Sequence, residues 1–146
     1  MAELNVSRKN IQGLLSLNDP TTKGKIFVIP EYQRPYRWEV DTCDVLWNDL
    51  KNFFEEHKDD DREYFLGSIV TCDDTDEQNR INIIDGQQRI TSFLLLLRAF
   101  YYKLEDQLVD NPSDEEVEGL MKSIEPCIWK INPMTKKVSN KKETHI

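Results

Sequence analysis

The stretch Ile81-Asn-Ile-Ile-Asp-Gly-Gln-Gln-Arg-Ile-Thr91 joins a short apolar run, an Asp-Gly turn and the start of a long amphipathic segment. This pattern predicts a strand that passes through a tight turn directly into a helix. The first N–H groups of a helix have no intrahelical partner, and the helix dipole adds about half a positive charge there, so the junction suits an anion such as phosphate. Arg89 falls in the first helical turn, where a cation opposes the dipole, and its guanidinium fork matches phosphate oxygens.

The segments on either side of this junction predict an α+β domain. Helices are expected over residues 3–17, from an Asp41 N-cap to His57, over 87–108, and after the capping-box pattern Ser113-Asp-Glu-Glu116. Strands are expected over residues 25–30, 64–70, 80–84 and 127–131. The acidic connection 73–79 is then the loop of a β-hairpin whose second strand ends at the Asp-Gly turn, and calcium binding is the weaker reading because no EF-hand pattern is present.

Apolar periodicity indicates where the core lies. The 87–108 segment is apolar over so much of its circumference that we expect a central buried helix, and the helix beginning at Asp41 should pack its Leu and Phe face on the core. Trp47 and Trp129 are expected to be core residues.

Composition limits the class of protein. The 146 residues carry a net charge of −8, with 38% hydrophobic and 32% charged residues, which is typical of one globular domain. No apolar run approaches the roughly 20 residues of a membrane span, and the start of the chain has no signal peptide, so we expect a cytoplasmic protein without a membrane partner. Three unpaired cysteines and two histidines match neither a disulfide framework nor a zinc site.

The charge is unevenly distributed. Residues 51–110 carry 14 acidic and 7 basic side chains, which argues against a broad nucleic-acid surface there, so any DNA contact would be local. We expect a domain over residues 1–132 and a solvated basic tail over 133–146, with Lys136, Lys137, Lys141 and Lys142, which reads as the start of a truncated region.

Three motifs carry a family resemblance. Ile29-Pro-Glu-Tyr-Gln-Arg-Pro-Tyr-Arg-Trp38, Phe65-Leu-Gly-Ser-Ile-Val70 and Ile84-Asp-Gly-Gln-Gln-Arg-Ile-Thr91 occur in this order, and the chain closely resembles the GmrSD-type restriction endonuclease N-terminal domain family. The resemblance implies a ParB/sulfiredoxin-like fold, a small mixed sheet with a central buried helix after the Asp-Gly-Gln-Gln-Arg turn, and a nucleoside-triphosphate site. It also implies a bacterial or phage-defence protein that restricts modified DNA, with an HNH-type nuclease centre outside these residues. The sequence departs from the family at Ile90-Thr91-Ser92, where Leu-Thr-Thr is common.

The third motif supplies most of the candidate site. Gly86 permits close approach of a ligand, and the amides after it hold phosphates together with Arg89 and Thr91. Gln87 and Gln88 are candidates to orient a water or to contact the base and ribose. Asp85 is the candidate ligand for Mg²⁺ beside a triphosphate. The competing reading is an ordinary tight turn with a surface arginine.

The other two motifs add fewer residues. The resemblance favours Gln33 and Arg34 as site residues, with Arg34 neutralising developing charge. The alternating aromatics and cations of residues 32–38 either stack on a base or form a cation–π framework that fixes Arg34 near the phosphates. The competing reading is that Tyr36 and Trp38 pack on the core while Arg37 pairs with an acidic neighbour. The Gly67-Ser68 pair marks a bulge or packing constraint rather than an approach to the ligand.

Two classes of function follow. The first is a domain that binds, and as an enzyme hydrolyses, a nucleoside triphosphate with Mg²⁺, through electrostatic stabilisation and without a covalent intermediate. The alternatives are a DNA-binding or DNA-cleaving ParB-like module and a structural or interaction fragment. The expected partners are the nucleotide, DNA through a C-terminal region absent from this sequence, and a second copy of the chain.

Overall fold

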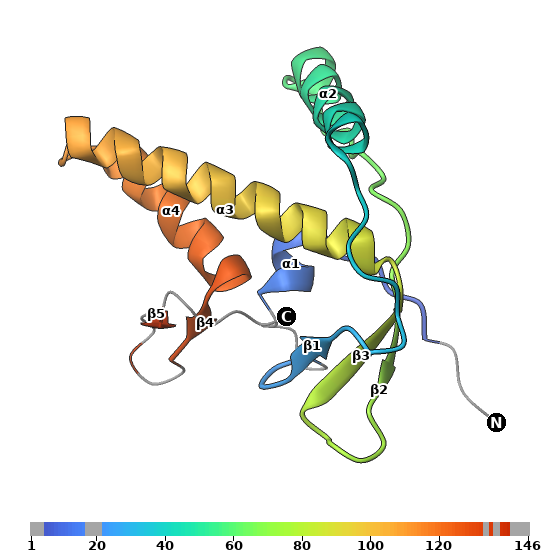
Figure 1. Cartoon of the computed structure of the whole chain (residues 1–146). Helices are drawn as coiled ribbons and strands as arrows, with labels where there is room; N and C mark the ends of the chain where they lie inside the picture. Colours follow the sequence, from blue (N-terminus) through green and yellow to red (C-terminus); the bar gives the residue numbers. More distant parts are fainter. Residues whose placement is uncertain (1–4, 17–21, 133–134, 136–137, 141–146) are drawn as a thin grey trace.

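The computed structural model describes residues 5–16, 22–132, 135 and 138–140, and it confirms a mixed α+β architecture. The helices are α1 (Ile11–Leu15), α2 (Val40–His57), α3 (Gln87–Asp110) and α4 (Glu115–Ile128). The strands are β1 (Ile26–Val28), β2 (Val70–Asp73), β3 (Arg80–Asp85), β4 (Lys130–Ile131) and β5 (Val138–Asn140). The long helix α3 runs across the molecule over α4, the three-stranded sheet lies at its amino-terminal end, and α2 stands away from both (Figure 1). The ParB/sulfiredoxin-like fold itself stays a prediction.

Strand β3 is the centre of the sheet, whose order is β1-β3-β2. β1 pairs with it in parallel and β2 pairs with it antiparallel, so the predicted hairpin is confirmed. Alternate residues Ile81 and Ile83 are buried, as expected for a strand with one face on the core. The predicted first strand of the hairpin is wrong over residues 64–69, which are irregular, and the pairing starts only at Val70.

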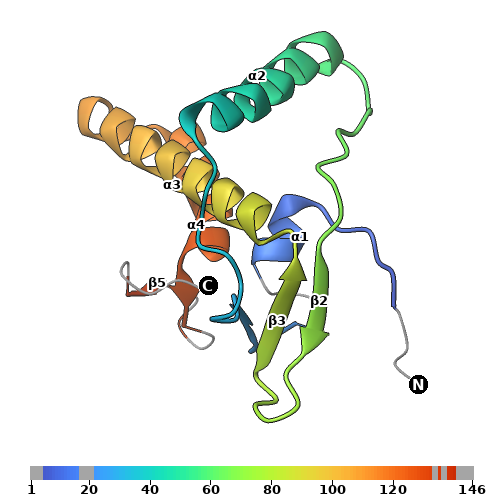
Figure 2. The same ribbon diagram turned by 45° about the vertical axis from the view of Figure 1, so that its right-hand side comes forward.

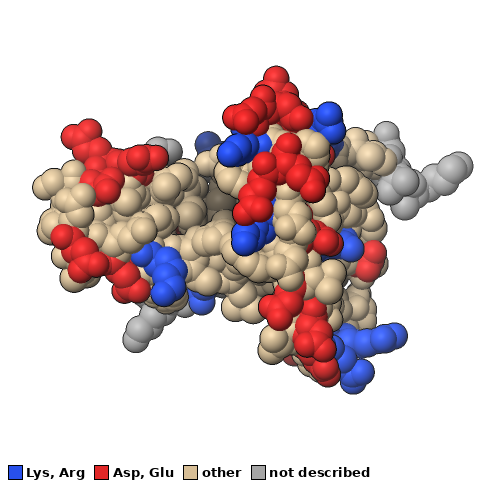
Figure 3. Space-filling view, turned by 90° about the horizontal axis from the view of Figure 1, so that it is seen from above, with Lys and Arg blue, Asp and Glu red and all other residues tan. Residues whose placement is uncertain are grey.

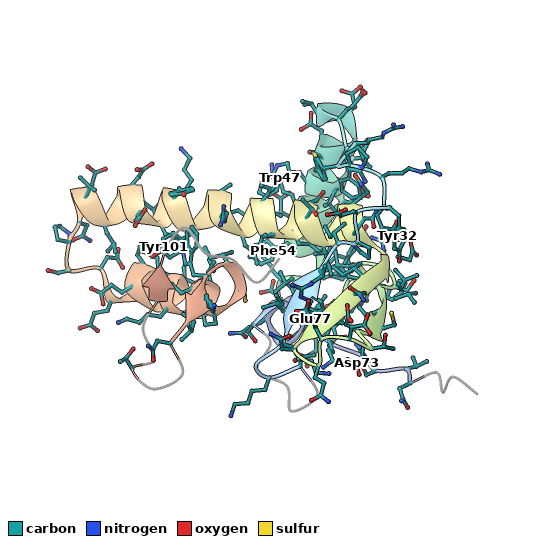
Figure 4. The ribbon with its side chains drawn as sticks, turned by 60° about the horizontal axis from the view of Figure 1, so that its bottom comes forward. Tyr32, Trp47, Phe54, Asp73, Glu77 and Tyr101 are labelled. Atoms are coloured by element: carbon teal, nitrogen blue, oxygen red, sulfur yellow. The ribbon has the colours of Figure 1, made fainter. Side chains whose placement is uncertain are left out.

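The loop of this hairpin is organised by Asp74. Its Oδ1 accepts hydrogen bonds from the backbone N–H groups of Asp76 and Glu77, at 2.9 and 3.1 Å, and its Oδ2 accepts one from Asn82 Nδ2 at 3.0 Å. These bonds, that from the Asp76 amide foremost, lower the pKa of Asp74 because they stabilise the ionised carboxylate. The acidic loop is therefore a hydrogen-bonded turn at the far end of the sheet (Figure 4).

Helix α3 connects two buried clusters. Its first turn contributes Ile90 to the cluster on the sheet, and its middle contributes Phe93, Leu94 and Tyr101 to a larger cluster with α4. The central helix predicted for 87–108 is thus confirmed, although Leu95 on its outer side is 50% exposed. Asp114 caps α4 by accepting from the Val117 N–H at 3.1 Å, one residue after the expected cap.

The prediction for α2 is wrong in two respects, its burial and its N-cap. Among the described residues of this helix none is buried, and Trp47, expected in the core, is 42% exposed (Figure 4). The start of this helix meets α3 at Leu46 and at Trp47, whose ring centroid lies 5.9 Å from that of Phe100, while its later turns stand away from α3 and α4 (Figure 2). Asp41 is not the N-cap: that position is Glu39, which makes no side-chain capping bond.

Three smaller expectations differ at the ends of the chain. α1 is shorter than predicted and starts at an Asn10 cap. Cys127 and Ile128 end α4 instead of starting a strand. β5 pairs with β4 within the segment expected as a tail. The four lysines of that segment lie outside the described residues, as do residues 3, 4 and 17 of the expected first helix. No helix in the described part of the chain has the length and hydropathy of a membrane span.

Candidate functional site

The three motifs meet at the amino-terminal end of α3. The segment between β1 and α2 passes the turn from β3 into α3 (Figures 1 and 2). Residues of this segment and of the turn line a pocket of about 200 Å³. Its lining residues come from the first and third motifs: Gln33, Trp38, Ile84, Asp85, Gly86, Gln87, Gln88 and Arg89. The second motif lies against this lining through Arg89, as described below.

The turn into α3 is made by Gly86. Its backbone is left-handed, with φ 88° and ψ 9°, a conformation that glycine adopts without steric cost. The first intrahelical bond is from Ile90 N–H to the Gly86 carbonyl at 3.0 Å. The N–H groups of residues 87–89 therefore have no intrahelical acceptor and give this end of the pocket a positive potential.

Hydrogen bonds of two glutamine side chains connect the first motif to the end of β3 and the start of α3. The Gln88 amide accepts from the Arg37 N–H at 2.7 Å and donates to the Pro35 carbonyl at 3.1 Å. Gln33 Nε2 donates back to the Ile84 carbonyl at 3.2 Å. Gln88 uses both amide atoms on the segment 35–37, so its observed contacts fix that segment, and its orientation of a water stays a prediction. These partners are about 50 residues apart in sequence, and no local pattern could have indicated them.

Arg89 brings the second motif to the pocket. Its Nη1 donates to the Ser68 carbonyl at 2.8 Å, and its guanidinium lies against Gly67. The guanidinium is half-buried and lines the pocket. Five N–H groups are available on a guanidinium, so the bond to Ser68 leaves donors for an anion.

Asp85 ends β3 at the edge of the same pocket, with its side chain exposed. Among the described residues, no group of three or more His, Cys, Asp or Glu side chains is placed to hold a metal. A single carboxylate nevertheless fits Mg²⁺ bound chiefly by phosphates and water, the usual arrangement beside a triphosphate.

Two predicted residues do not line the pocket. The Thr91 hydroxyl donates to the Gln87 carbonyl at 2.8 Å within the helix. Arg34 contributes its carbonyl, which lies 3.5 Å from Gln87 Nε2, while its exposed side chain is absent from the lining. Their roles toward a ligand stay predictions.

The aromatic residues of the first motif divide between two places. Trp38 is half-buried in the pocket wall. The Tyr36 hydroxyl lies 2.9 Å from Ser92 Oγ and borders a second, mostly apolar cavity between α2 and α3. Burial raises the pKa of Tyr36. Tyr32, labelled in Figure 4, is exposed near the same end of α3.

Charge makes this end of α3 distinct from its surroundings. Seen from the side on which α2 stands, Asp and Glu side chains form several groups on a mostly uncharged surface, with Lys and Arg side chains beside some of them (Figure 3). The pocket instead combines one guanidinium, free helical N–H groups and one carboxylate, which is a suitable set for an anion that carries a divalent cation.

A match to a known protein family covers nearly the whole chain. The family model described as GmrSD restriction endonuclease, N-terminal domain, matches residues 12–145. No curated protein matched the sequence. The matched range contains all three segments that meet at the pocket.

Proposed function

The chain belongs to the family of GmrSD restriction endonuclease N-terminal domains, and we propose that it binds and hydrolyses a nucleoside triphosphate with Mg²⁺ as part of a modification-dependent restriction or phage-defence protein. One observation carries the proposal. Arg89, the N–H groups of residues 87–89, which have no intrahelical acceptor, and the Asp85 carboxylate lie at a single pocket. That combination provides donors for phosphate oxygens beside an acceptor for a hydrated cation.

Each residue has a defined part in this proposal. The α3 amides and Arg89 bind phosphate oxygens, and Asp85 holds Mg²⁺ through water, so that negative charge on the phosphates is neutralised. Trp38 offers an aromatic surface against which a base can stack. Catalysis is electrostatic stabilisation and alignment of water, with no covalent intermediate. Gln88 and Gln33 hold the segment that carries Trp38 and Arg34.

Thermal unfolding with ATP, GTP, CTP or UTP and Mg²⁺ tests the binding. A ligand at 100 times its Kd stabilises by about 2.7 kcal/mol, which raises the Tm of a chain of this size by several degrees. We expect a shift with at least one nucleotide, lost in Arg89→Ala and kept in Arg62→Ala, which removes the same charge from a residue outside the pocket lining. Equal shifts in both variants would contradict the assignment of Arg89.

A second candidate is suggested by two exposed cations. Arg34 and Arg37 lie on the segment between β1 and α2, and the restriction-endonuclease family suggests DNA as a partner. If this segment binds a DNA backbone, affinity should fall steeply with salt and fall again in an Arg34→Ala, Arg37→Ala double variant. Absence of binding at low salt would exclude this candidate for the chain.

A further inference from the structure

We propose that Gly67 and the Ser68 carbonyl form a seat for the Arg89 guanidinium, and that Gly67 is a positioning residue for the anion site. The inference deepens the proposed function and rests on it for the identity of the ligand. The contact between Gly67 and Arg89 is itself a property of the fold and can be tested without any ligand.

The close approach of the guanidinium requires glycine. A Cβ placed on Gly67 would lie 2.6 Å from Arg89 Nη1, 2.7 Å from Cζ and 3.0 Å from Nη2. Three atoms of the planar group thus lie around the place that a Cβ would occupy, so the guanidinium lies against Gly67. The two shorter distances are below those of real Cβ contacts, and any side chain at this position would force the Arg89 guanidinium to move.

A second glycine allows the seat to approach the helix. A Cβ on Gly86 would lie 3.2 Å from the Ser68 carbonyl oxygen and 3.0 Å from Ile69 Cγ1. Gly67 and Gly86 both have positive φ, 100° and 88°. At Gly86 the backbone of the second motif therefore approaches the third motif closely, whereas at Gly67 the second motif meets the Arg89 side chain.

The chemistry of the seat suits an anion site. The Ser68 carbonyl accepts one N–H of Arg89 at 2.8 Å and carries no charge. None of the ion pairs among the described residues includes Arg89. A carboxylate in the same place would fix the side chain equally well but would neutralise the charge that a phosphate needs. A carbonyl holds the guanidinium in one orientation and leaves its charge available.

The chain offers a matched control for the backbone effect. Gly24 has φ 78°, and nothing lies within 4 Å of a Cβ placed on it. Gly24→Ala therefore introduces a comparable unfavourable backbone conformation without touching Arg89, whereas Gly67→Ala introduces both effects.

The first experiment needs no ligand. Urea unfolding is measured for the wild type, Gly67→Ala, Arg89→Ala and the double variant. We expect Gly67→Ala to reduce the folding equilibrium constant roughly three- to tenfold more in the presence of Arg89 than in the Arg89→Ala background, because only Arg89 meets the new methyl group and would give up its hydrogen bond to Ser68. Equal effects in the two backgrounds would overturn the seat. If Gly67→Ala is too unstable to measure, Arg89→Ala is compared with the wild type by urea unfolding. Loss of the bond to the Ser68 carbonyl should lower the folding equilibrium constant roughly three- to tenfold, and an unchanged constant would overturn the proposal.

The second experiment measures affinity for the Mg²⁺ complexes of ATP, GTP, CTP and UTP. Gly67→Ala should raise Kd at least tenfold, while Gly24→Ala stays within twofold of the wild type. Wild-type binding that Gly67→Ala leaves unchanged would overturn the positioning role and keep the proposed function. No wild-type binding to any triphosphate would overturn the positioning role for this ligand together with the proposed function, and the unfolding cycle would still decide whether the seat exists.

Discussion

The two ends of α3 are held by different chemistry. Toward its carboxyl end, Tyr101 packs edge-on to Trp129, with ring centroids 6.4 Å apart, and Arg98 lies 4.4 Å over the same indole ring. At its amino end, Gln88 and Arg89 bind backbone atoms of two distant segments. Buried apolar contacts are worth several kcal/mol per residue and tolerate small shifts, whereas each hydrogen bond is worth about 1 kcal/mol and fixes direction. One helix thus takes its stability from one end and the geometry of its site from the other.

The largest effect is expected where the packed end is weakened. Ile128 is fully buried against α3, and Ile128→Ala should lower the free energy of unfolding by about 2–5 kcal/mol because it leaves a cavity. Leu120, 49% exposed on the same helix, is the control, and its alanine variant should cost far less. Urea unfolding measures both. Nucleotide affinity of the folded Ile128→Ala protein should match the wild type, and a large loss would show that the two ends are not separate.

The stability contributed by the packing of α3 on α4 should also depend on pH, through Cys127 of α4. Burial raises the pKa of the Cys127 thiol to about 11 from an ordinary value of 9.0. Between these values the unfolded chain releases a proton that the folded chain keeps, so stability is complete below about pH 9 and falls as pH rises toward 11, by about 1.4 kcal/mol per pH unit. The stability difference between the wild type and Cys127→Ala, measured by urea unfolding from pH 8 to 10, should shrink with pH. A constant difference would exclude this contribution.

At the amino end of α3 we expect a smaller loss of free energy of unfolding and a larger increase in local hydrogen exchange. Gln88→Ala removes the bonds to Arg37 and Pro35 and should cost about 1–3 kcal/mol. The Arg37 amide should exchange its hydrogen at least tenfold faster, because its acceptor is gone. Gln107→Ala, at an exposed position near the other end of α3, should change neither quantity appreciably. Unchanged exchange at Arg37 would mean that other contacts hold the segment.

The smallest loss of stability is expected at Tyr36, which borders the cavity between α2 and α3. Tyr36→Phe removes the hydroxyl that lies 2.9 Å from Ser92 Oγ and keeps the ring. Because Ser92 also bonds the Gln88 carbonyl at 2.9 Å, it keeps a partner, and the cost should be at most about 1 kcal/mol. Urea unfolding measures this, and a cost above about 2 kcal/mol would indicate that the hydroxyl organises more of the junction between α2 and α3.

The features that the sequence predicts correctly are determined by residues close to one another in sequence. The start of α3 follows from Asp85-Gly86 and its length from a continuous apolar face, both local signals. The apolar stripe of α2 is equally clear in the sequence, yet periodicity cannot predict whether another element packs against it. In the described structure no residue of α2 is buried. Residues 64–69 likewise have strand composition without a pairing partner in the described residues, because pairing depends on distant chain.

The site was predictable in its third motif and much less so in its connections. Arg89 at a helix start pointed to an anion from local physics alone. Gln88 binds residues 35–37 across about 50 positions of sequence, and Gly67 contacts Arg89 across 22. No rule of residue spacing predicts contacts over such separations. The one available signal was the glycine in the run 64–70, which was interpreted as a bulge or packing constraint and did not identify Arg89 as its neighbour.

The parallel pairing of β1 with β3 has a consequence for chain entropy. Ile26 lies opposite Arg80, so the intervening chain, which includes all of α2, forms one large loop. Closing a loop of this size costs about 3.5 kcal/mol in its length-dependent part alone. The pocket lies beside this closure, where residues 33–38 and 67–69, both within the loop, join the start of α3. An anion bound there would act as a reversible cross-link between distant parts of the chain, and its departure would loosen the loop as a whole.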